Sequence, residues 1–431
     1  MTFTMILGVG AALLPTSGVQ ASTHPRQTEP LTAGEAGSGP PMPPPARLSA
    51  AQMASASGIK FNDVPAKLAD QSGSGINYFM PAIRFVAGAN NWMRDYKVVK
   101  DGTYPFNPNK IETRELFARA VVKAFAPKVA VDPSITFPDL PSDDPFYPFA
   151  NVAVQKGWIK ATKSGAFHPL SSVVMRGVHR ALVLAVGLGP TAKDLDAIHT
   201  ASGYAFKTPR GFGTTLLGMR LGLRYNHSSP YEGVDVDPSS PMSRSEVAYS
   251  LYRAATLDSW VVPSLESQYG AITLPNLGPK LTQLVQWGID FVGYPYYWGG
   301  EWDTKTPAGY PFGAQVRGGF DCSGLTWWVL KRTGNGWDNA PPRPYHGWPL
   351  PQRTSTDMAT LGKVGWNHLL PGDAMFYDGN GDHVVDHVDT YIGNGFSIDS
   401  SSTPGGVTLM WVGDGWYHDH FVHGRHVIVA K

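Results

Sequence analysis

The chain has 431 residues, of which 42% are hydrophobic, and its formal net charge is +1 at pH 7. This length corresponds to about two to four domains, at roughly 100–200 residues each. A nearly neutral charge gives no electrostatic basis for binding nucleic acid or an acidic membrane surface. The single cysteine excludes an internal disulfide and any zinc site built on a cysteine pair. We therefore expect several folded domains, no nucleic-acid partner and no cofactor.

The first residues combine a short apolar run with a pattern that suits signal peptidase. Residues 5–14 are apolar but too few to span a bilayer, which takes about 20 residues. The sequence VQA, ending at Ala21, then matches a small-x-small cleavage site. We expect residues 1–21 to be a signal peptide and the mature chain to be secreted to the cell wall without a membrane span. Residues 22–57, rich in Pro, Gly and Ala, are expected to be a linker.

A sequence pattern recurs three times between residues 58 and 256. In each copy a proline is followed six or seven residues later by an arginine, and apolar residues then recur at helical spacing. The pairs are Pro108 and Arg114, Pro169 and Arg176, and Pro238 and Arg244. A repeat of about 60–70 residues with two helices means several small units packed on one another. The expected repeats are residues 58–126, 127–190 and, in degenerate form, 191–256.

The copies resemble the S-layer homology domain, which usually occurs in threes. The resemblance rests on Phe61-Asn62-Asp63, Phe137-Pro138-Asp139, Thr113-Arg114 and Ser243-Arg244-Ser245-Glu246. It implies an all-α array that binds a secondary cell-wall polysaccharide, with Arg114, Arg176 and Arg244 as candidate contacts. The first two copies lack the family's Thr-Arg-x-Glu pattern and the third lacks the opening motif. The three arginines could therefore instead only cap or bridge helices.

The remaining residues predict a connection and then an α+β domain. Residues 257–278 show no sustained period and are expected to link two domains. An amphipathic helix is predicted from Lys280, with Leu281, Leu284, Val285 and Val292 on one face. Strand-like segments follow in DAMFYDG (373–379), HVDTYIGNG (387–395), FSIDS (396–400), VTLMWV (407–412) and HVIVAK (426–431). Helices followed by strands indicate an α+β domain over residues 279–431.

The only cysteine, Cys322, opens the apolar-periodic stretch SGLTWWVLKR and is expected at a helix N-terminus. Unpaired N–H groups there favour a thiolate, and they can receive the oxyanion of an acyl-transfer intermediate. The small residues Ser323 and Gly324 are expected to let a substrate backbone approach. These features indicate a nucleophile, against the alternatives of an inert buried thiol or an intermolecular bridge.

Four motifs in order resemble the NlpC-type family of cell-wall cysteine endopeptidases. They are PYYWGG (295–300), GFDCSGL (319–325), LLPGDAMFY (369–377) and HVDTYIGNG (387–395). The resemblance implies a papain-like domain, with helices packed on an antiparallel sheet, that cuts peptidoglycan stem peptides near D-glutamate and diaminopimelate. By this match Cys322 is the nucleophile, His387 the base and Asp399 the residue that orients it. Tyr296 and Ser323 would line the substrate or oxyanion site.

Two residues near the base leave alternatives open. His383 is the rival base, but it precedes the predicted strand that His387 heads. Asp389 replaces the small residue usual in the family, and strand alternation places it on the face of His387. There it could assist the base, narrow the groove or change the substrate, and we expect an effect on substrate preference.

The C-terminal histidines and the whole activity also have alternatives. His418, His420, His423 and His426 are close in sequence, the first two on a possible strand. Such a run without cysteines or paired carboxylates is more often unliganded, so no metal site is predicted. The alternative to a hydrolase is a non-catalytic envelope-binding protein that uses a degenerate peptidase domain for recognition. An intact set of Cys322, His387 and Asp399 favours the hydrolase.

Overall fold

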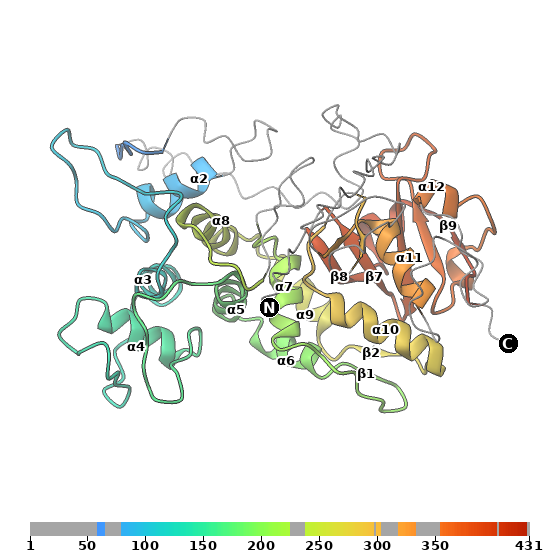
Figure 1. The fold of residues 1–431 in the computed structure, drawn as a ribbon, viewed down its shortest axis with the longest axis horizontal. Coiled ribbons are helices and arrows are strands. Elements are labelled where there is room, and N and C mark those ends of the chain that lie inside the picture. The colour runs from blue at the N-terminus through green and yellow to red at the C-terminus, as the bar shows by residue number, and fades with distance from the viewer. Residues whose placement is uncertain are drawn as a thin grey trace, which may run out of the picture.

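The computed structural model describes residues 58–64, 79–224, 238–296, 299–302, 318–332, 354–402 and 405–428. The expected signal peptide and linker, residues 1–57, lie outside these ranges. Figure 1 shows a group of helices beside a part that contains a sheet. Within the described ranges, no helix has the length and apolar character that crossing a bilayer requires.

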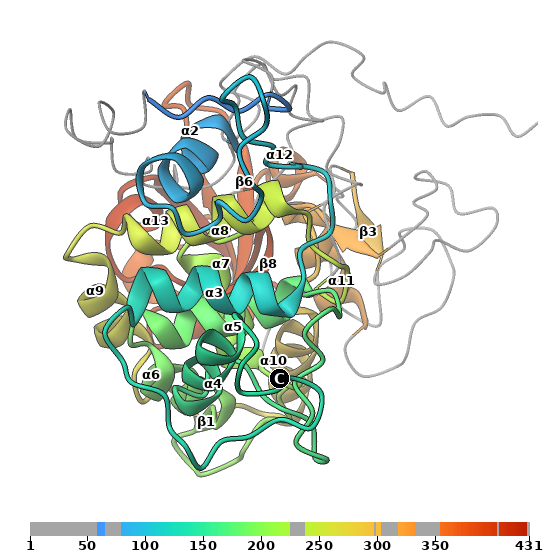
Figure 2. The ribbon, with the colours of Figure 1, turned by 90° about the vertical axis from the view of Figure 1, so that its left-hand side faces the viewer.

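The N-terminal part is helical. Its elements are α2 (Phe79–Ile83), the π-helix η1 (Arg84–Ala89), α3 (Arg114–Phe125), α4 (Tyr147–Gln155), α5 (Met175–Ala185), α6 (Gly189–Asp196), α7 (Phe212–Arg220) and α8 (Arg244–Ala255). Helices α3, α5 and α8 each follow one of the three proline motifs, where the sequence predicts them. Each of these three helices contacts the other two, and Figure 2 looks onto this group.

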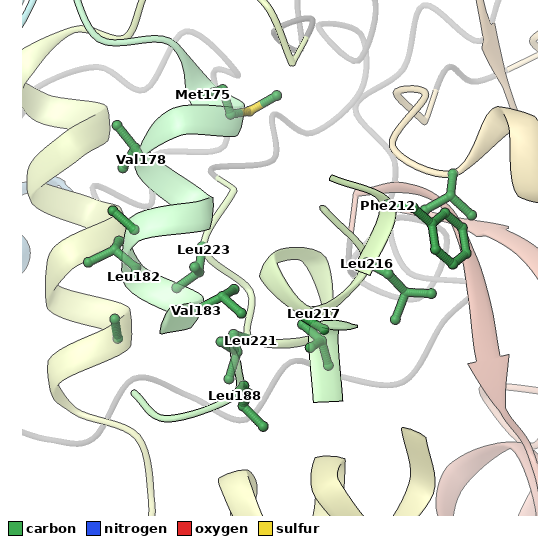
Figure 3. Close-up of a cluster of buried hydrophobic side chains, with 14 of the residues drawn as sticks. Met175, Val178, Leu182, Val183, Leu188, Phe212, Leu216, Leu217, Leu221 and Leu223 are labelled. Atoms are coloured by element: carbon green, nitrogen blue, oxygen red, sulfur yellow. The ribbon is translucent and has the colours of Figure 1, made fainter. Parts of the chain in front are cut away.

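The helical spacing of apolar residues explains how these helices pack. Val178 and Leu182 of α5 are fully buried, as are Leu216 and Leu217 of α7. Figure 3 shows these side chains in one buried cluster, in which Val183 of α5 and Leu217 of α7 lie between the two helices while Val178 and Leu182 lie on the other side of α5. Burying a leucine or valine side chain contributes about 1.5–3 kcal/mol, so this cluster contributes to the stability of the array.

At the start of each of α3, α5 and α8, a backbone N–H donates a hydrogen bond to a loop of another copy, and the three bonds form a closed cycle. The backbone N–H of Arg114 donates to Ser171 O, that of Met175 to Ser240 O, and that of Arg244 to Lys110 O. Each of these carbonyls lies two residues after the motif proline of another copy, so copy one rests on copy two, copy two on copy three, and copy three on copy one. The cycle therefore makes Met175, not Arg176, the counterpart of Arg114 and Arg244. The sequence pattern misaligned the second copy by one residue.

Two aspartates of the opening motifs occupy equivalent places. The Asp63 carboxylate accepts the backbone N–H groups of Phe106 and Asn107, and the Asp139 carboxylate accepts those of Phe167 and His168. Asn107 and His168 both adopt the left-handed conformation, with φ of 56° and 57°. Internal repetition is thus a structural property of the array, while its likeness to S-layer homology repeats stays a prediction.

The segment 257–278, expected as a connection, is itself folded. It holds α9 (Val261–Tyr269) and β2 (Thr273–Leu274), which pairs in parallel with β1 (His199–Thr200). Fully buried Tyr269 donates its hydroxyl to Leu409 O at 3.1 Å and accepts the Trp411 N–H at 3.2 Å. An element of nine residues is too short to show a clear helical period, so its sequence did not reveal it.

The C-terminal part mixes helices with a five-stranded antiparallel sheet, as the α+β prediction required. Its elements are α10 (Pro279–Phe291), β3 (Glu301–Trp302), β4 (Gly319–Phe320), α11 (Cys322–Arg332), α12 (Ser355–Met358), the 3₁₀-helix η3 (Trp366–His368), β5 (Ala374–Tyr377), β6 (His387–Gly393), β7 (Phe396–Ser401), β8 (Gly406–Trp411), α13 (Gly415–Asp419) and β9 (Phe421–Arg425). The strand order is β8-β7-β6-β5-β9.

Strands β5 and β6 lie within the predicted segments and β7 and β8 extend beyond theirs by one residue, but the last predicted strand is wrong. The fifth strand is β9, which pairs with β5, and His426 to Ile428 lie beyond its end. Residues 429–431 are outside the described ranges. The prediction failed because His423 and Gly424 interrupt the apolar pattern of β9, whereas residues 426–431 contain the apolar run that is typical of a strand.

Both faces of this sheet are covered, which places the candidate site in the interior. Helix α11 packs on β6 and β7, and α10 packs on β8. The opposite face carries Met375, Tyr377, Met410 and Tyr417, the last from α13. Successive side chains along β6 and β7 point to opposite faces of the sheet, and nearly all of them are buried.

Candidate active site

Cys322 is the first residue of α11, as the sequence predicts. The preceding Asp321 caps this helix, since its Oδ1 accepts the Gly324 N–H at 2.5 Å and the Ser323 hydroxyl at 3.2 Å. Its Oδ2 accepts the Gly299 N–H at 2.9 Å. One aspartate thus fixes both the helix start and the neighbouring loop, and the thiol is held where helix N–H groups favour an anion.

Gly324 serves a different purpose from the expected one. A Cβ at this position would lie 1.9 Å from Gly300 O, which itself accepts the Asp321 N–H at 3.0 Å. The missing side chain therefore makes room for the protein's own backbone, not for substrate. Tyr296 is 2% exposed and pairs with Phe320 in an isolated bridge, so it lies beside the strand that leads to Cys322.

His387 and Asp399 form a buried pair on adjacent strands. Imidazole Nε2 lies 2.9 Å from Asp399 Oδ1, and neither side chain is exposed. Because Asp399 occupies Nε2, Nδ1 is the ring nitrogen left for the thiol. Burial alone lowers the pKa of His387, but the Asp399 carboxylate and the nearby Cys322 thiol outweigh it and hold that pKa well above its usual value. The arrangement stabilises an imidazolium between a carboxylate and a thiol.

Two tyrosines and a serine that sequence reasoning missed donate hydrogen bonds to the two buried carboxyl groups of this face. The Tyr417 hydroxyl donates to Asp399 Oδ2 at 2.8 Å. The Tyr377 and Ser397 hydroxyls donate to Asp389 Oδ2 at 3.0 Å and 2.5 Å. Strand alternation could have placed Tyr377 and Ser397, but no sequence signal connects Tyr417 of α13 with β7.

Asp389 does not reach a substrate groove. It lies on the face of His387, as alternation predicts, but its side chain is fully buried and bound by hydroxyls of neighbouring strands. The buried side chain of Asp389 therefore has no direct contact through which it could affect substrate preference. Alternation predicts which face a strand residue occupies, but not whether another element covers that face.

The other histidines are held separately. His383 lies in the loop before β6, where its backbone N–H donates to Asp378. His418 lies in α13 and not on a strand, and His420 stacks on Trp416 with ring centroids 4.6 Å apart. His423 bonds Ala359 O, whereas His426 pairs with Asp373. Within the described residues, no three histidine, cysteine or carboxylate side chains come together as metal ligands.

The three candidate arginines of the array differ in accessibility. Arg244 is fully buried: its Nη1 donates to Glu112 at 2.8 Å and its Nη2 to Asp95 at 2.7 Å. Arg114 is partly buried and donates to the carbonyls of Phe167 and Lys160. Arg176 is exposed. This geometry favours a structural role for Arg244, so a polymer could reach only Arg114 and Arg176 without rearrangement.

Comparisons with known proteins find relatives that match about a third of this chain. The murein DD-endopeptidase MepH of Escherichia coli (strain K12) is 29% identical over 143 residues, 32% of this chain and 43% of that protein. The bifunctional muramidase/DL-endopeptidase CwlT of Bacillus subtilis (strain 168) is 26% identical over 135 residues, 31% and 32% of the two chains. A gamma-D-glutamyl-L-lysine dipeptidyl-peptidase of the same strain is 28% identical over 147 residues, 33% and 40%. The chain thus spans less than half the length of each of these relatives.

The model of the NlpC/P60 family matches residues 293–426. Cys322, His387 and Asp399 all lie within this range, and so do the five strands of the sheet. The resemblance inferred from the four motifs is therefore confirmed for this part of the chain: residues 293–426 form an NlpC/P60 domain.

Proposed function

We propose that the protein is a secreted peptidoglycan hydrolase that cleaves amide bonds in stem peptides through Cys322, His387 and Asp399. The observation that carries the proposal is the His387–Asp399 pair, 2.9 Å apart and fully buried, next to a cysteine at a helix N-terminus. A buried imidazolium beside a thiol keeps the sulfur as thiolate, which is the nucleophilic form.

The geometry supports a thiol mechanism in two halves. The Cys322 thiolate attacks the amide carbonyl, and the N–H groups at the start of α11 stabilise the oxyanion. His387 then gives its proton to the leaving amine as a thioester forms. Water, deprotonated by the imidazole, hydrolyses the thioester and restores the thiol. Asp399 keeps the ring oriented throughout.

The proposed substrate class is based on the relatives, which differ in the peptide bond that they cleave. Their names describe DD-, DL- and gamma-D-glutamyl-L-lysine activities, all on peptides of peptidoglycan type. We propose the bond between D-glutamate and diaminopimelate as the first to test. We also propose that the repeat array holds the enzyme at the envelope by binding a wall polysaccharide, with Arg114 and Arg176 as the accessible contacts.

Digestion of purified muropeptides by the full chain, followed by mass spectrometry, tests this function. We expect new fragments whose masses identify one cleaved amide bond, and no fragments with Cys322→Ala. Muropeptides that are bound by the wild type but never cut would instead support the alternative, a non-catalytic envelope-binding protein. Fragments at equal rates with both proteins would disprove the cysteine mechanism.

A further inference from the structure

A second buried carboxyl group, Asp389, lies on the strand of the proposed base. Its Oδ2 accepts the hydroxyls of Tyr377 and Ser397. Its Oδ1 is buried and has no hydrogen-bond partner among the described residues. An ionised carboxylate with one bare oxygen in the interior is costly, whereas the neutral acid loses much less on burial.

The sheet register places Asp389 next to the reacting pair. Thr390 on β6 lies opposite Ile398 on β7, so the adjoining residues Asp389 and Asp399 occupy the same face. Three titratable groups on the sheet act on Asp389: Tyr377 on β5, His387 on β6 and Asp399 on β7. Tyr417 on α13 interacts with Asp389 as well, and Arg220 on α7 acts on Tyr417. Two carboxyl groups this close in a dry interior do not both carry a charge without cost.

Resting on the function proposed above, we propose that Asp389 is a positioning residue that tunes the reacting pair. As the neutral acid it ties β5, β6 and β7 together behind the pair through Tyr377 and Ser397. As a carboxylate, at higher pH, it adds a negative charge that keeps the proton on His387. The active form of the Cys322–His387 pair then persists further into alkaline solution than Asp399 alone would allow.

The sign of this effect follows from reciprocity. Burial, and then the charge of Asp399, raise the pKa of Asp389 to about 8, while the charge of His387 acts to lower it. Because an interaction between two titrating groups is mutual, an ionised Asp389 must raise the pKa of His387. The effect is absent in acidic solution, where Asp389 is neutral, and grows through the region near pH 8.

The test measures the alkylation of Cys322 by iodoacetamide against pH in the full chain. Asp389→Asn keeps the size and the neutral hydrogen bonding but cannot ionise. We expect its alkaline limb to lie at lower pH than the wild type's, by about half a unit, with a difference that grows with pH. A rate lowered by the same factor at every pH, or an unmoved limb, would overturn the proposal and leave Asp389 a structural residue.

Two further variants sharpen the experiment. Ser397→Ala removes a hydroxyl that favours the ionised form of Asp389, so less Asp389 should be ionised at a given alkaline pH. The alkaline limb of this variant should therefore lie between those of the wild type and Asp389→Asn. Asp373→Asn removes another buried carboxyl group, just before β5, whose partners are His426 and the Leu370 N–H. Its alkylation profile should match the wild type's. The alkylation experiment uses no peptidoglycan, so its outcome does not depend on whether the protein hydrolyses it. Unchanged hydrolysis by Cys322→Ala would refute the proposed function but would leave the measured effect of Asp389 on the alkylation profile standing.

Discussion

Tyr417 donates its hydroxyl to Asp399 on the oxygen opposite the one that pairs with His387, at 2.8 Å. Burial, and then the Asp399 charge, raise the pKa of Tyr417 well above its usual value, so it remains a hydrogen-bond donor at any working pH. Both carboxylate oxygens are thus engaged, and the carboxylate is fixed in the orientation that the imidazole requires. A residue on a short helix after β8 thereby supports a pair formed by β6 and β7.

Tyr417→Phe should test this support. The ring keeps its packing against Tyr377 and Trp416, but one carboxylate oxygen loses its donor. A hydrogen bond to a charged group contributes about 1.5–3 kcal/mol, so we expect hydrolysis to fall roughly 10- to 100-fold with little change in KM. Steady-state kinetics on a purified muropeptide measure both quantities. A rise in KM alone would show that Tyr417 contacts substrate instead.

Asp399→Asn should have the larger effect. Loss of the negative charge removes the main interaction that raises the pKa of His387, so the alkaline limb of Cys322 alkylation should move to lower pH. The displacement should exceed that of Asp389→Asn, because only Asp399 contacts the imidazole. Equal displacements would mean that the two carboxyl groups share the role.

The identity of the base can be separated from its rival with a matched pair of variants. His387→Ala should abolish hydrolysis, because the ring next to the thiol is lost. His383→Ala changes an exposed loop side chain whose backbone alone is bound to Asp378, and activity should remain within about twofold. Muropeptide digestion with both variants decides the matter, and the reverse pattern would assign the base to His383.

The sequence predicted what depends on local patterns and on one family resemblance. The start of α11 at Cys322 follows from the apolar period that this residue opens, and the family resemblance placed His387 and Asp399 on neighbouring strands. The burial of Asp389 was not predictable, because it depends on β5, β7 and α13, which come together only in the fold. Nor was the contribution of Tyr417, which lies 18 residues from Asp399 along the chain.

The array shows the same division between local and tertiary information. The three proline motifs predicted the three helices correctly, yet matching by nearest arginine paired Arg176 with Arg114 and Arg244. Only the hydrogen bonds between copies reveal that Met175 occupies this position. The difference of one residue decides whether the side chain faces the interior or solvent, because one residue turns a helix by about 100°.

Substituting these arginines should separate structure from binding. Arg244→Ala leaves Glu112 without its buried cation and Asp95 with Arg119 alone, and breaking such a buried pair typically costs about 3–5 kcal/mol. Arg176→Ala, at an exposed position, should change stability by less than about 0.5 kcal/mol. Urea unfolding of both variants gives these values. Sedimentation with cell walls should then be tested with Arg176→Ala and Arg114→Ala, since a loss with Arg244→Ala would reflect unfolding. Equal stabilities would contradict the buried role of Arg244.

The array should also stabilise the NlpC/P60 domain. Arg224 donates to Gly405 O at 2.9 Å, Arg220 lies against Met410, and Tyr269 is bonded to β8 on both sides of its hydroxyl. A piece limited to residues 279–431 loses these bonds, at about 1 kcal/mol each, and should melt roughly 8–16 °C below the full chain. Tyr269→Phe in the full chain, which removes two of the bonds, should fall between them. Identical melting temperatures would show that the two parts are independent.

The pH dependence of stability gives the last test, because Asp389 should make the protein less stable as pH rises. Its pKa is about 8 in the folded protein and 3.8 for an ordinary aspartate, so between these values the folded state holds one proton more than the unfolded state. Stability therefore falls with rising pH across this window, by up to about 1.4 kcal/mol per pH unit, and the fall ends above pH 8. Asp389→Asn lacks this pH-dependent contribution to the free energy of unfolding, because its side chain cannot ionise. In a Cys322→Ala background, urea unfolding from pH 5 to pH 9 should show the Asp389→Asn protein gaining stability over its parent until about pH 8, with a constant difference beyond. A difference that does not vary with pH would mean that Asp389 is ionised throughout, and the tuning proposed for it would fail with that result.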